Sequence, residues 1–250
     1  MDLKLQGKSA LVSGASMGIG RAIAKALSAE GVHVCITARR RELLDQLRDE
    51  IIAARGPQPD VITADIMGED APQRLAKAAF DALGKIDILV NSAGGSRPLA
   101  IDAPEHEWTE GITLNFTRVR QLTHAILPRM IDEQWGRIIN ITGKSEPSGL
   151  NAAPPAKAAV HLWAKALARE VGKHGITVNC IPPGRIVSEQ ILRNFDEKER
   201  DDFAKKHIPL GRFGDPAELA ALAVFLASPL ACYITGTVIP VDGGLRRYAY

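Results

Sequence analysis

Residues Ser9–Ala29 read SALVSGASMGIGRAIAKALSA and carry the strongest indication of the fold class. The first five residues, Ser9–Ser13, form a short apolar run of the kind found in buried strands. The last part, Arg21–Ala29, has the apolar spacing of a helix, and the glycine-rich segment Gly14–Gly20 joins the two. Such a loop brings free backbone amides and the positive end of a helix to a phosphate group. The stretch therefore predicts a dinucleotide-binding turn. Because its spacing is GxxxGxG rather than GxGxxG, an ordinary strand-to-helix turn is the alternative.

Short apolar runs alternate with longer amphipathic stretches along the rest of the chain. Seven runs are predicted strands: Ser9–Ser13, Val32–Thr37, Val61–Ala64, Ile86–Asn91, Arg137–Thr142, Ile176–Ile181 and Val238–Val241. Five stretches are predicted helices: Arg21–Ala29, Glu42–Ala54, Gln73–Leu83, Glu105–Ile131 and Ala156–Val171. Strands separated by helices favour right-handed crossovers and a parallel sheet. The predicted fold class is α/β, a Rossmann-type doubly wound sheet of seven parallel strands with helices on both faces.

The chain shows no internal repeat, low-complexity tract or linker, so residues 1–250 are expected to form a single domain. Asp215–Glu218 places a cap, a first-turn proline and a reaching glutamate in order, which predicts a helix start. The segment 185–213 lacks a predicted strand and is dense in charge, and we expect it to be a mobile substrate flap. Its apolar residues Ile191, Leu192 and Phe195 suggest a partly apolar substrate.

Composition excludes several classes of protein. With 46% hydrophobic and 24% charged residues in 250, the chain has the balance of an ordinary globular protein, not of a disordered one. Its 31 basic and 29 acidic residues leave a net charge of +2, and only Arg39–Arg41 form a basic run, so no nucleic-acid partner is expected. Three widely spaced cysteines, Cys35, Cys180 and Cys232, suggest core thiols in a reducing compartment and no metal site. Without a long apolar segment, no membrane contact is expected, and the predicted location is the cytoplasm.

Two arginines at the end of the second predicted strand indicate the cofactor. An acidic residue there would hydrogen-bond the ribose 2′-hydroxyl of NAD(H), whereas Arg39 and Arg40 would bind a 2′-phosphate in bidentate geometry. The sequence therefore favours NADP(H) over NAD(H). The alternative is that both arginines merely begin a solvated helix.

Several motifs, in order along the chain, resemble those of the short-chain dehydrogenase/reductase family. They are the glycine loop, Asp65 after the third strand, Asn91–Gly94 in place of the family's NNAG, Asn115 in the long helix, Pro183–Ser188, and the ending Gly236–Gly244. The resemblance covers nearly the whole length. It implies that Asp65 contacts the adenine, that Asn115 holds a water in a helical kink, and that Pro183–Ser188 hold the nicotinamide.

The resemblance also implies a set of cofactor-binding residues and an assembly. The expected binding residues are Gly14, Ser16, Met17, Gly18, Ile19, Gly20, Arg39, Arg40, Asp65, Ile66, Asn91, Ala93, Gly94, Lys157, Pro183, Gly184, Ile186 and Ser188. A small-molecule substrate is expected. By analogy, the chain forms a homotetramer through the helices at Glu105–Ile131 and Ala156–Val171 and through the last strand.

The sequence departs from the family at the residues that carry its chemistry. Lys157 matches the lysine of the family's YxxxK pair, but Ala153 stands where the tyrosine belongs, and the chain's tyrosines all lie in its last eighteen residues. Gly143 stands at the position of the family's serine, and the connection to the next helix is short. A positioned general acid is worth about 10²–10⁴-fold in rate, and an oxyanion donor roughly 10²–10³-fold. An atypical active site is therefore expected.

Three functions remain open. In the first, the protein is an NADP(H)-dependent oxidoreductase with Lys157 and Asn115 as catalytic residues and a relocated proton donor, such as Ser145, Lys144 or a tyrosine of the tail 245–250. In the second, Lys157 acts as a base or Schiff-base nucleophile in a hydrolase or lyase. In the third, the chain is a catalytically silent, nucleotide-binding subunit. His161, one helical turn past Lys157, is more often a packed residue than a proton relay.

Overall fold

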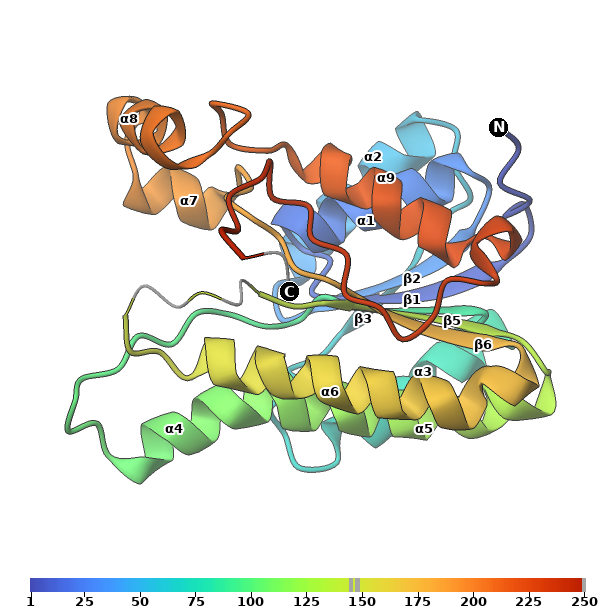
Figure 1. The fold of residues 1–250 in the computed structure, drawn as a ribbon. Helices are drawn as coiled ribbons and strands as arrows, with labels where there is room; N and C mark the ends of the chain where they lie inside the picture. Colours follow the sequence, from blue (N-terminus) through green and yellow to red (C-terminus); the bar gives the residue numbers. More distant parts are fainter. Residues whose placement is uncertain (144–145, 147–148, 249–250) are drawn as a thin grey trace.

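The computed structural model describes residues 1–143, 146 and 149–248, and within them a six-stranded parallel sheet lies between two layers of helices (Figure 1). The strands are β1 (Ser9–Ser13), β2 (His33–Ala38), β3 (Asp60–Thr63), β4 (Ile88–Asn91), β5 (Gly136–Ile141) and β6 (Ile176–Ile181). They lie in the order β3-β2-β1-β4-β5-β6, with all neighbours parallel. This is the order of a doubly wound dinucleotide-binding sheet, whose winding reverses between β1 and β4.

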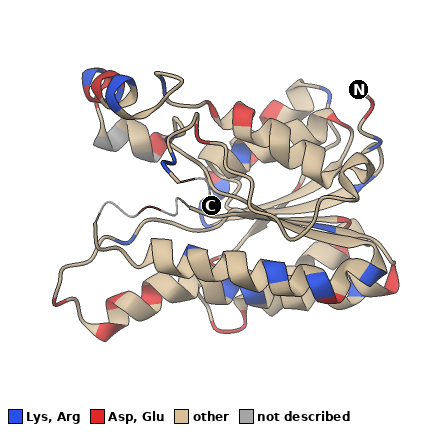
Figure 2. Cartoon of the chain, in the orientation of Figure 1, with Lys and Arg blue, Asp and Glu red and all other residues tan. Residues whose placement is uncertain are grey.

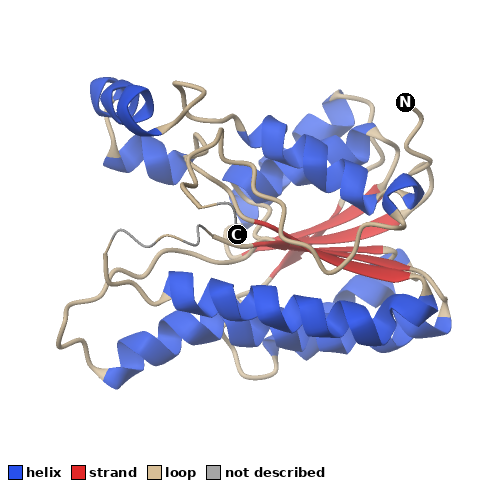
Figure 3. Ribbon diagram, in the orientation of Figure 1, coloured by secondary structure: helices blue, strands red, loops and turns tan. Residues whose placement is uncertain are grey.

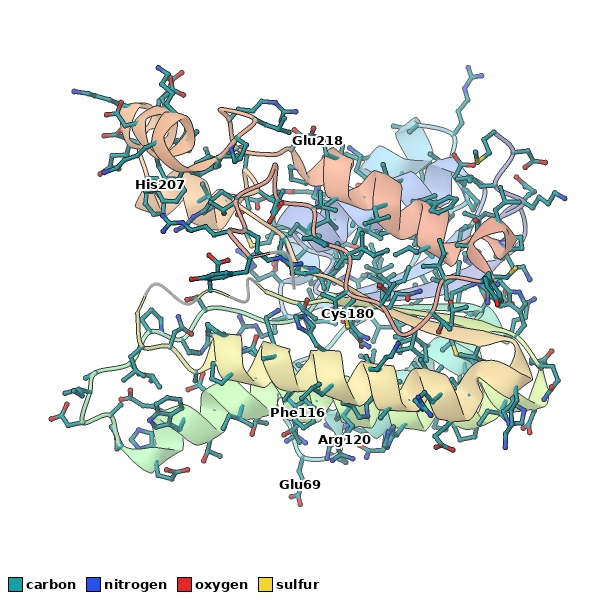
Figure 4. The ribbon with its side chains drawn as sticks, viewed as in Figure 1. Glu69, Phe116, Arg120, Cys180, His207 and Glu218 are labelled. Carbon is teal, nitrogen blue, oxygen red and sulfur yellow. The ribbon has the colours of Figure 1, made fainter. Side chains whose placement is uncertain are left out.

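Figure 3 shows the strands between the two helical layers. One face is covered by α1 (Gly18–Ala29), α2 (Arg41–Ala53) and α9 (Pro216–Ala227), and the other by α3 (Ala71–Leu83), α5 (Arg118–Asp132) and α6 (Ala153–Val171). Outside these layers lie α4 (Glu105–Ile112), α7 (Glu189–Asn194) and α8 (Glu197–His207). Short turns are η1 (Thr113–Thr117), η2 (Gly172–His174) and η3 (Pro229–Ala231). Figure 4 accordingly shows Glu218 of α9 and Arg120 of α5 on opposite sides of the molecule.

The core follows from the alternation of side chains along each strand. Ala10 and Val12 of β1 pack against the layer of α1, α2 and α9, whereas Leu11 between them packs against α3 and α5. Successive side chains of a strand point to opposite faces, so each apolar run supplies both halves of the core. The predicted parallel sheet with two covered faces is therefore confirmed.

The prediction of a seventh strand at Val238–Val241 is wrong for this structure. The segment runs alongside β6 in parallel direction but makes only isolated bridges, between Cys180 and Val238 and between Pro183 and Val241. Cys180 and Gly184 donate from their amides to this segment, but Pro182 between them has no backbone N–H, so the ladder is interrupted there. The last stretch is still tied to β6, since the amide of Ile239 donates to the carbonyl of Cys180 at 2.9 Å.

The long helix expected at Glu105–Ile131 is divided. It consists of α4, one π-helical turn at η1 and α5, and Asn115 lies buried in the π turn. The Asn115 side chain donates from Nδ2 to the carbonyl of Gly111, four residues earlier, at 2.9 Å. A side chain that takes a carbonyl of its own helix accounts for a local change of hydrogen-bond pattern, and such turns are frequent at functional sites.

The segment 185–213 forms two helices, α7 and α8, with a small apolar cluster of its own. Phe213, Ile208 and Ala204 are its buried members, and Val187, Ile191, Phe203 and Leu245 pack against them. Acidic and basic residues both lie on α8, as Figure 2 shows. The flap therefore has an internal core, and whether it moves stays a prediction.

The cysteines occupy two kinds of environment. Cys35 and Cys180 are buried, and burial raises the pKa of each thiol to about 12. Cys232 is exposed, so the expectation that all three are core thiols is wrong at that position: Cys232 follows the turn η3 at the surface. Among the described residues, no helix combines the length and apolar character needed to cross a membrane.

Candidate active site

The glycine loop leaves β1 where the winding of the sheet reverses. Gly14 has a φ of +68°, and a Cβ added there would lie 2.8 Å from the backbone nitrogen of Ala93. A Cβ on Gly20 would overlap the carbonyl of Gly14. No side chain caps the first turn of α1, whose N-cap residue is Met17. The close approach requires glycine, and it leaves the first amides of α1 available to an anion.

Ser13 joins the loop to the segment that follows β4. Its hydroxyl accepts from the amides of Ser92 and Ala93 at 3.1 and 3.2 Å and donates to the carbonyl of Val90 at 3.2 Å. In the register of the sheet, Ser13 lies opposite Asn91, so β1 and β4 end together. Ser13 was not predicted as a site residue, because its only local signal is its place at the end of a strand.

A cleft of about 820 Å³ extends over these strand ends. This is within the usual size of a cofactor site. Two buried polar atoms on its wall, Thr37 Oγ1 and Glu189 Oε2, have no hydrogen-bond partner among the described residues. Buried polar atoms are nearly always paired, so this wall is suited to a polar ligand. The closed glycine turn, the free amides of α1 and these two atoms fit a dinucleotide.

Arg39 and Arg40 lie at one end of this cleft, together with Asp65. Arg40 is the N-cap residue of α2, and its guanidinium lies 3.0 Å from the sulfur of Met17 in the glycine loop. Within the described residues, neither arginine pairs with a carboxylate, whereas Arg41 binds Asp45 at 2.8 Å. Two unpaired guanidinium groups beside a phosphate-binding turn form a site for a further anion.

Lys157, Asn115 and Gly94 meet at the other end of the cleft. Lys157 Nζ donates to the carbonyls of Ile141 and Thr142 at 3.1 and 3.2 Å. Desolvation by burial lowers the pKa of Lys157 to about 8. A Cβ on Gly94 would lie 3.2 Å from Lys157 Nζ and 3.0 Å from Asn115 Oδ1, so both polar groups face this glycine. A buried amine with a lowered pKa marks a candidate catalytic group.

The positions at which the sequence departs from the family also border the cleft. Ala153 lies in the first turn of α6 and is 6% exposed. Gly143 lies against the lysine, since a Cβ there would be 3.1 Å from Lys157 Cδ. Pro154 and Pro155 stand in the first turn of α6 without breaking it, because amides there have no intrahelical partner.

The C-terminal tail lies over its own cleft loop. The backbone amides of Arg247 and Tyr248 donate to Glu146 Oε1 at 2.9 and 3.4 Å. The side chain of Tyr248 is 71% exposed, and Tyr233 is fully exposed. Neither phenol lines the cleft. Three other proton-donor candidates, Ser145, Lys144 and Tyr250, lie outside the described residues.

Most of the predicted cofactor-binding residues come together at the cleft. The residues that line it are Gly14, Ser16, Met17, Gly18, Ile19, Gly20, Arg39, Arg40, Asp65, Ile66, Ala93, Gly94, Lys157, Pro183 and Ser188. Asn91, Gly184 and Ile186 do not line it. Asn91 donates instead to Thr123 and Asn140 at 3.0 and 2.9 Å, so its amide stabilises the sheet.

Asn151 was not foreseen as a site residue. Its Oδ1 accepts from the amides of Arg97 and Ala153, at 3.0 and 2.9 Å, and its Nδ2 donates to Ser96 Oγ at 2.7 Å. It thereby fixes the start of α6 to the segment after β4. A polar residue just before a helix is the only local signal that it carries.

Arg97 and Glu110 were also not predicted. Arg97 Nε pairs with Glu110 Oε1 at 2.9 Å, and both residues line the cleft. Thr142 Oγ1 lies 2.8 Å from His161 Nε2. Burial is the first cause that lowers the pKa of His161, followed by the charges of Arg246 and Lys157. These contacts join segments far apart in the chain.

The apolar residues of the flap do not line this cleft. Ile191 packs in the flap's own cluster, Phe195 lies under the guanidinium of Arg185, and Leu192 borders a separate cavity of about 620 Å³. Near Lys157 the described lining mixes polar residues, such as Ser96, Arg97 and Asn151, with apolar ones, such as Leu114 and Pro154. The prediction of a partly apolar substrate thus receives no support from these side chains.

Known proteins resemble this chain in both sequence and structure. Residues 14–246 match the family model described as enoyl-(acyl carrier protein) reductase. The chain is 37% identical over 247 residues to the 3-oxoacyl-[acyl-carrier-protein] reductase FabG of Vibrio cholerae, covering 97% of this chain and 99% of that protein.

Two solved structures are similar over almost their entire length. The L-sorbose reductase of Gluconobacter frateurii, complexed with NADPH and L-sorbose, has a TM-score of 0.94 and 29% identity, covering 99% of this chain and 100% of the other. The RhlG/NADP active-site complex of Pseudomonas aeruginosa has a TM-score of 0.89 and 36% identity, covering 97% and 98%.

Proposed function

Because the chain belongs to the short-chain dehydrogenase/reductase family, we propose that it is an NADP(H)-dependent oxidoreductase of a carbonyl or hydroxyl substrate whose proton donor is not the family's tyrosine. The observation that carries this proposal is a single cleft. It joins the glycine loop and the two arginines at one end to Lys157, beside Asn115, at the other. When bound there, the nicotinamide supplies or accepts a hydride.

The described residues account for each part of the cofactor. The free amides of α1 bind the pyrophosphate, and Asp65 faces the adenine end. Lys157, with Asn115 beside it, holds the nicotinamide ribose, and Pro183 and Ser188 border the ring. Ser188 Oγ also caps α7 by accepting from the amide of Ile191 at 3.4 Å. The same residue therefore contacts both the first helix of the flap and the cofactor.

The preference for NADP(H) rests on Arg39 and Arg40. A 2′-phosphate would give these unpaired guanidinium groups charge-assisted hydrogen bonds, each worth about 1.5–3 kcal/mol. The solved relatives named above contain NADPH or NADP in their complexes, which agrees with this proposal.

The substrate is proposed to be a small molecule whose carbonyl or hydroxyl group reacts beside Lys157. The named relatives act on 3-oxoacyl groups and on L-sorbose. Ser96, Arg97 and Asn151, which line the cleft near Lys157, favour a substrate that has hydrogen-bonding groups next to the reacting carbon.

A second candidate function follows from the lowered pKa of Lys157. A buried amine with a pKa of about 8 is a partly neutral nucleophile at pH 7–8, which suits a Schiff-base lyase or hydrolase. Borohydride trapping with a carbonyl substrate tests it: mass added at Lys157 supports a Schiff base, and unmodified Lys157 removes this candidate. A silent nucleotide-binding subunit is the third possibility, and hydride transfer by the isolated protein excludes it.

The homotetramer and the cytoplasmic location remain proposals. Leu162 on the outer side of α6 is 78% exposed, an apolar residue suited to an interface between copies. Light scattering tests the assembly, with four copies expected.

The cofactor proposal is tested by thermal unfolding with each nucleotide at equal concentration. At about 100 times Kd a ligand stabilises by about 2.7 kcal/mol, which for a chain of this size raises Tm by roughly 5–11 °C. NADPH is expected to raise Tm more than NADH, and Arg39→Asp is expected to reverse the order. Arg41→Asp is the matched control, because Arg41 already pairs with Asp45. Equal shifts in the unaltered protein contradict the preference, and no shift with either nucleotide contradicts the proposed function.

A further inference from the structure

We propose that the Lys157 ammonium group is itself the acid that protonates the substrate oxygen, held by two carbonyl groups at the end of β5 in space left open by Gly143 and Ala153. This inference rests on the proposed function, and it names the group that takes the place of the family's phenol. Because two of its three N–H groups are bound to carbonyls, the third N–H of Lys157 serves the substrate oxygen in this step in place of the nicotinamide ribose.

The hydrogen bonds of Lys157 leave one proton available. An ammonium group has three donors, and two of them are bound to the carbonyls of Ile141 and Thr142. No other acceptor among the described residues hydrogen-bonds Nζ. The two carbonyls fix the position of Nζ, and the third N–H lies on the side of Gly94 and the cleft, where Nζ is 3.2 Å from the Cβ position of that glycine.

The two small residues beside Lys157 explain why the lysine takes this position. A side chain at Gly143 would begin 3.1 Å from Lys157 Cδ and would press the lysine away from β5. Ala153, one helical turn before Lys157, presents only a methyl group to the cleft. Both substitutions therefore leave room between Nζ and the ligand. A substrate oxygen can approach Lys157 there.

The charges around Lys157 favour a group that both holds and releases a proton. From α6, the nearest titratable group is His161, whose lowered pKa makes it neutral at pH 7. Arg246 faces His161 from the tail, and Arg97 and Glu110 pair with each other in the segment after β4 and in α4. No carboxylate among the described residues binds Lys157. Burial is therefore the cause of the pKa of about 8 for Lys157. A general acid works best when its pKa lies close to the pH of the reaction.

Thr142 acts as a positioning residue in this arrangement. Its carbonyl accepts from Lys157, and its hydroxyl lies 2.8 Å from His161 Nε2. Lys157 and His161 are four residues apart on α6, so they share one face of the helix. Lys157 therefore binds the carbonyl of Thr142 while His161 contacts its hydroxyl group. The end of β5 is thereby fixed relative to the ammonium group.

The proposed step balances. A hydride from the reduced nicotinamide forms a C–H bond at the carbonyl carbon, and the electron pair of the C=O π bond moves to the oxygen. An N–H bond of Lys157 breaks as its proton bonds to that oxygen, so the carbonyl is reduced to a hydroxyl and the nicotinamide is oxidised. Lys157 is left as a neutral amine and regains a proton from water.

The first test measures the titration of Lys157 without any turnover. The protein is pulse-labelled with acetic anhydride between pH 6 and 11, and the modification of each lysine is followed by mass spectrometry. Lys157 is expected to show a midpoint near pH 8. Lys165, exposed on the same helix, is the internal control. A midpoint for Lys157 equal to that of Lys165 overturns the inference.

The second test follows NADPH oxidation with the N-acetylcysteamine thioester of acetoacetate at saturating nucleotide. The rate is expected to fall above about pH 8, and Lys157→Arg is expected to lower it by about 10²–10⁴-fold, because a guanidinium does not release its proton. Lys165→Gln is expected to keep the rate and its pH profile. If Lys157→Arg keeps more than a tenth of the rate, the inference is wrong although the proposed function stands. If calorimetry shows that the unaltered protein binds no NADPH, the proposed function itself fails.

Discussion

The substitution Gly14→Ala tests whether the approach of the glycine loop to the segment after β4 holds the cleft together. Alanine at this position meets two separate penalties. The φ of +68° costs a residue with a Cβ roughly 1–2 kcal/mol. In addition, the new Cβ would lie 2.8–2.9 Å from backbone atoms of Ser92 and Ala93, and such overpacking costs about 1–3 kcal/mol. The expected loss in the free energy of unfolding is therefore about 2–5 kcal/mol.

Gly84→Ala is the matched control for backbone strain alone. Gly84 ends α3 with a φ of +74°, but a Cβ there would have no atom within 4 Å. Its ψ of −46° lies outside the left-handed helical region, so the expected loss is that of backbone strain alone, about 1–3 kcal/mol. Comparison of the two variants separates strain from the close contact, which Gly14 alone makes.

Urea unfolding measures both losses, and calorimetry with NADPH measures the effect on binding. Gly14→Ala is expected to weaken NADPH binding by at least about tenfold, because the clash displaces Ala93 and the amides beside it. Gly84→Ala is expected to leave binding unchanged. If both variants lose the same stability and both bind NADPH normally, the close contact at Gly14 does not hold the cleft, and the reasoning is refuted.

Three further outcomes are expected. Ala153→Tyr alone should not produce an efficient ketone reductase, because Gly143 still lacks a hydroxyl; a rate gain above about 100-fold in steady-state assays would show otherwise. Lys157→Met should stabilise the nucleotide-free protein at pH 7 by about 1–3 kcal/mol, since the folded protein holds this lysine at a pKa near 8 and the unfolded chain near 10.5. Between pH 8 and pH 10.5 the unfolded chain binds more protons than the folded protein. The cost of burying the charged amine is therefore complete below pH 8, and the stability gained by Lys157→Met should vanish by about pH 10.5 in urea titrations. Glu218→Gln should lower Tm at pH 7, because bonds from Arg212 and from the amide of Asp215 hold the pKa of Glu218 at about 2 at the start of α9 (Figure 4). That stability is complete above pH 4.5 and is lost towards pH 2, so the Tm difference should shrink from pH 5 to pH 3, and a constant difference would contradict it.

Lys157 shows how stability and function oppose each other in this cleft. A buried amine that costs folding free energy is also the group with a pKa suited to proton transfer near neutral pH. Buried groups that lower stability are expected at active sites, because function there is often obtained at the expense of folding stability.

Much of the fold was predicted from local patterns. The apolar run at Ser9–Ser13, the glycine turn and the amphipathic stretch after it are short-range features, and the structure contains β1, the loop and α1 at those positions. The strand at Val238–Val241 was predicted by the same rule and is wrong, because its pairing depends on the prolines of a neighbour that precedes it by more than fifty residues.

The candidate site divides in the same way. The glycine turn, the arginines after β2, the lysine of α6 and the lack of a tyrosine at position 153 could all be predicted from the sequence, since each is a residue type at a fixed local spacing. Two contacts became visible only in the folded chain: Asn91 is bound to Asn140 of β5 and to Thr123 of α5, and Lys157 is held by the carbonyls at the end of β5. The physical reason is that spacing along the chain determines periodicity and turns, whereas the partner of a buried polar group is chosen by segments that meet only when the sheet has formed.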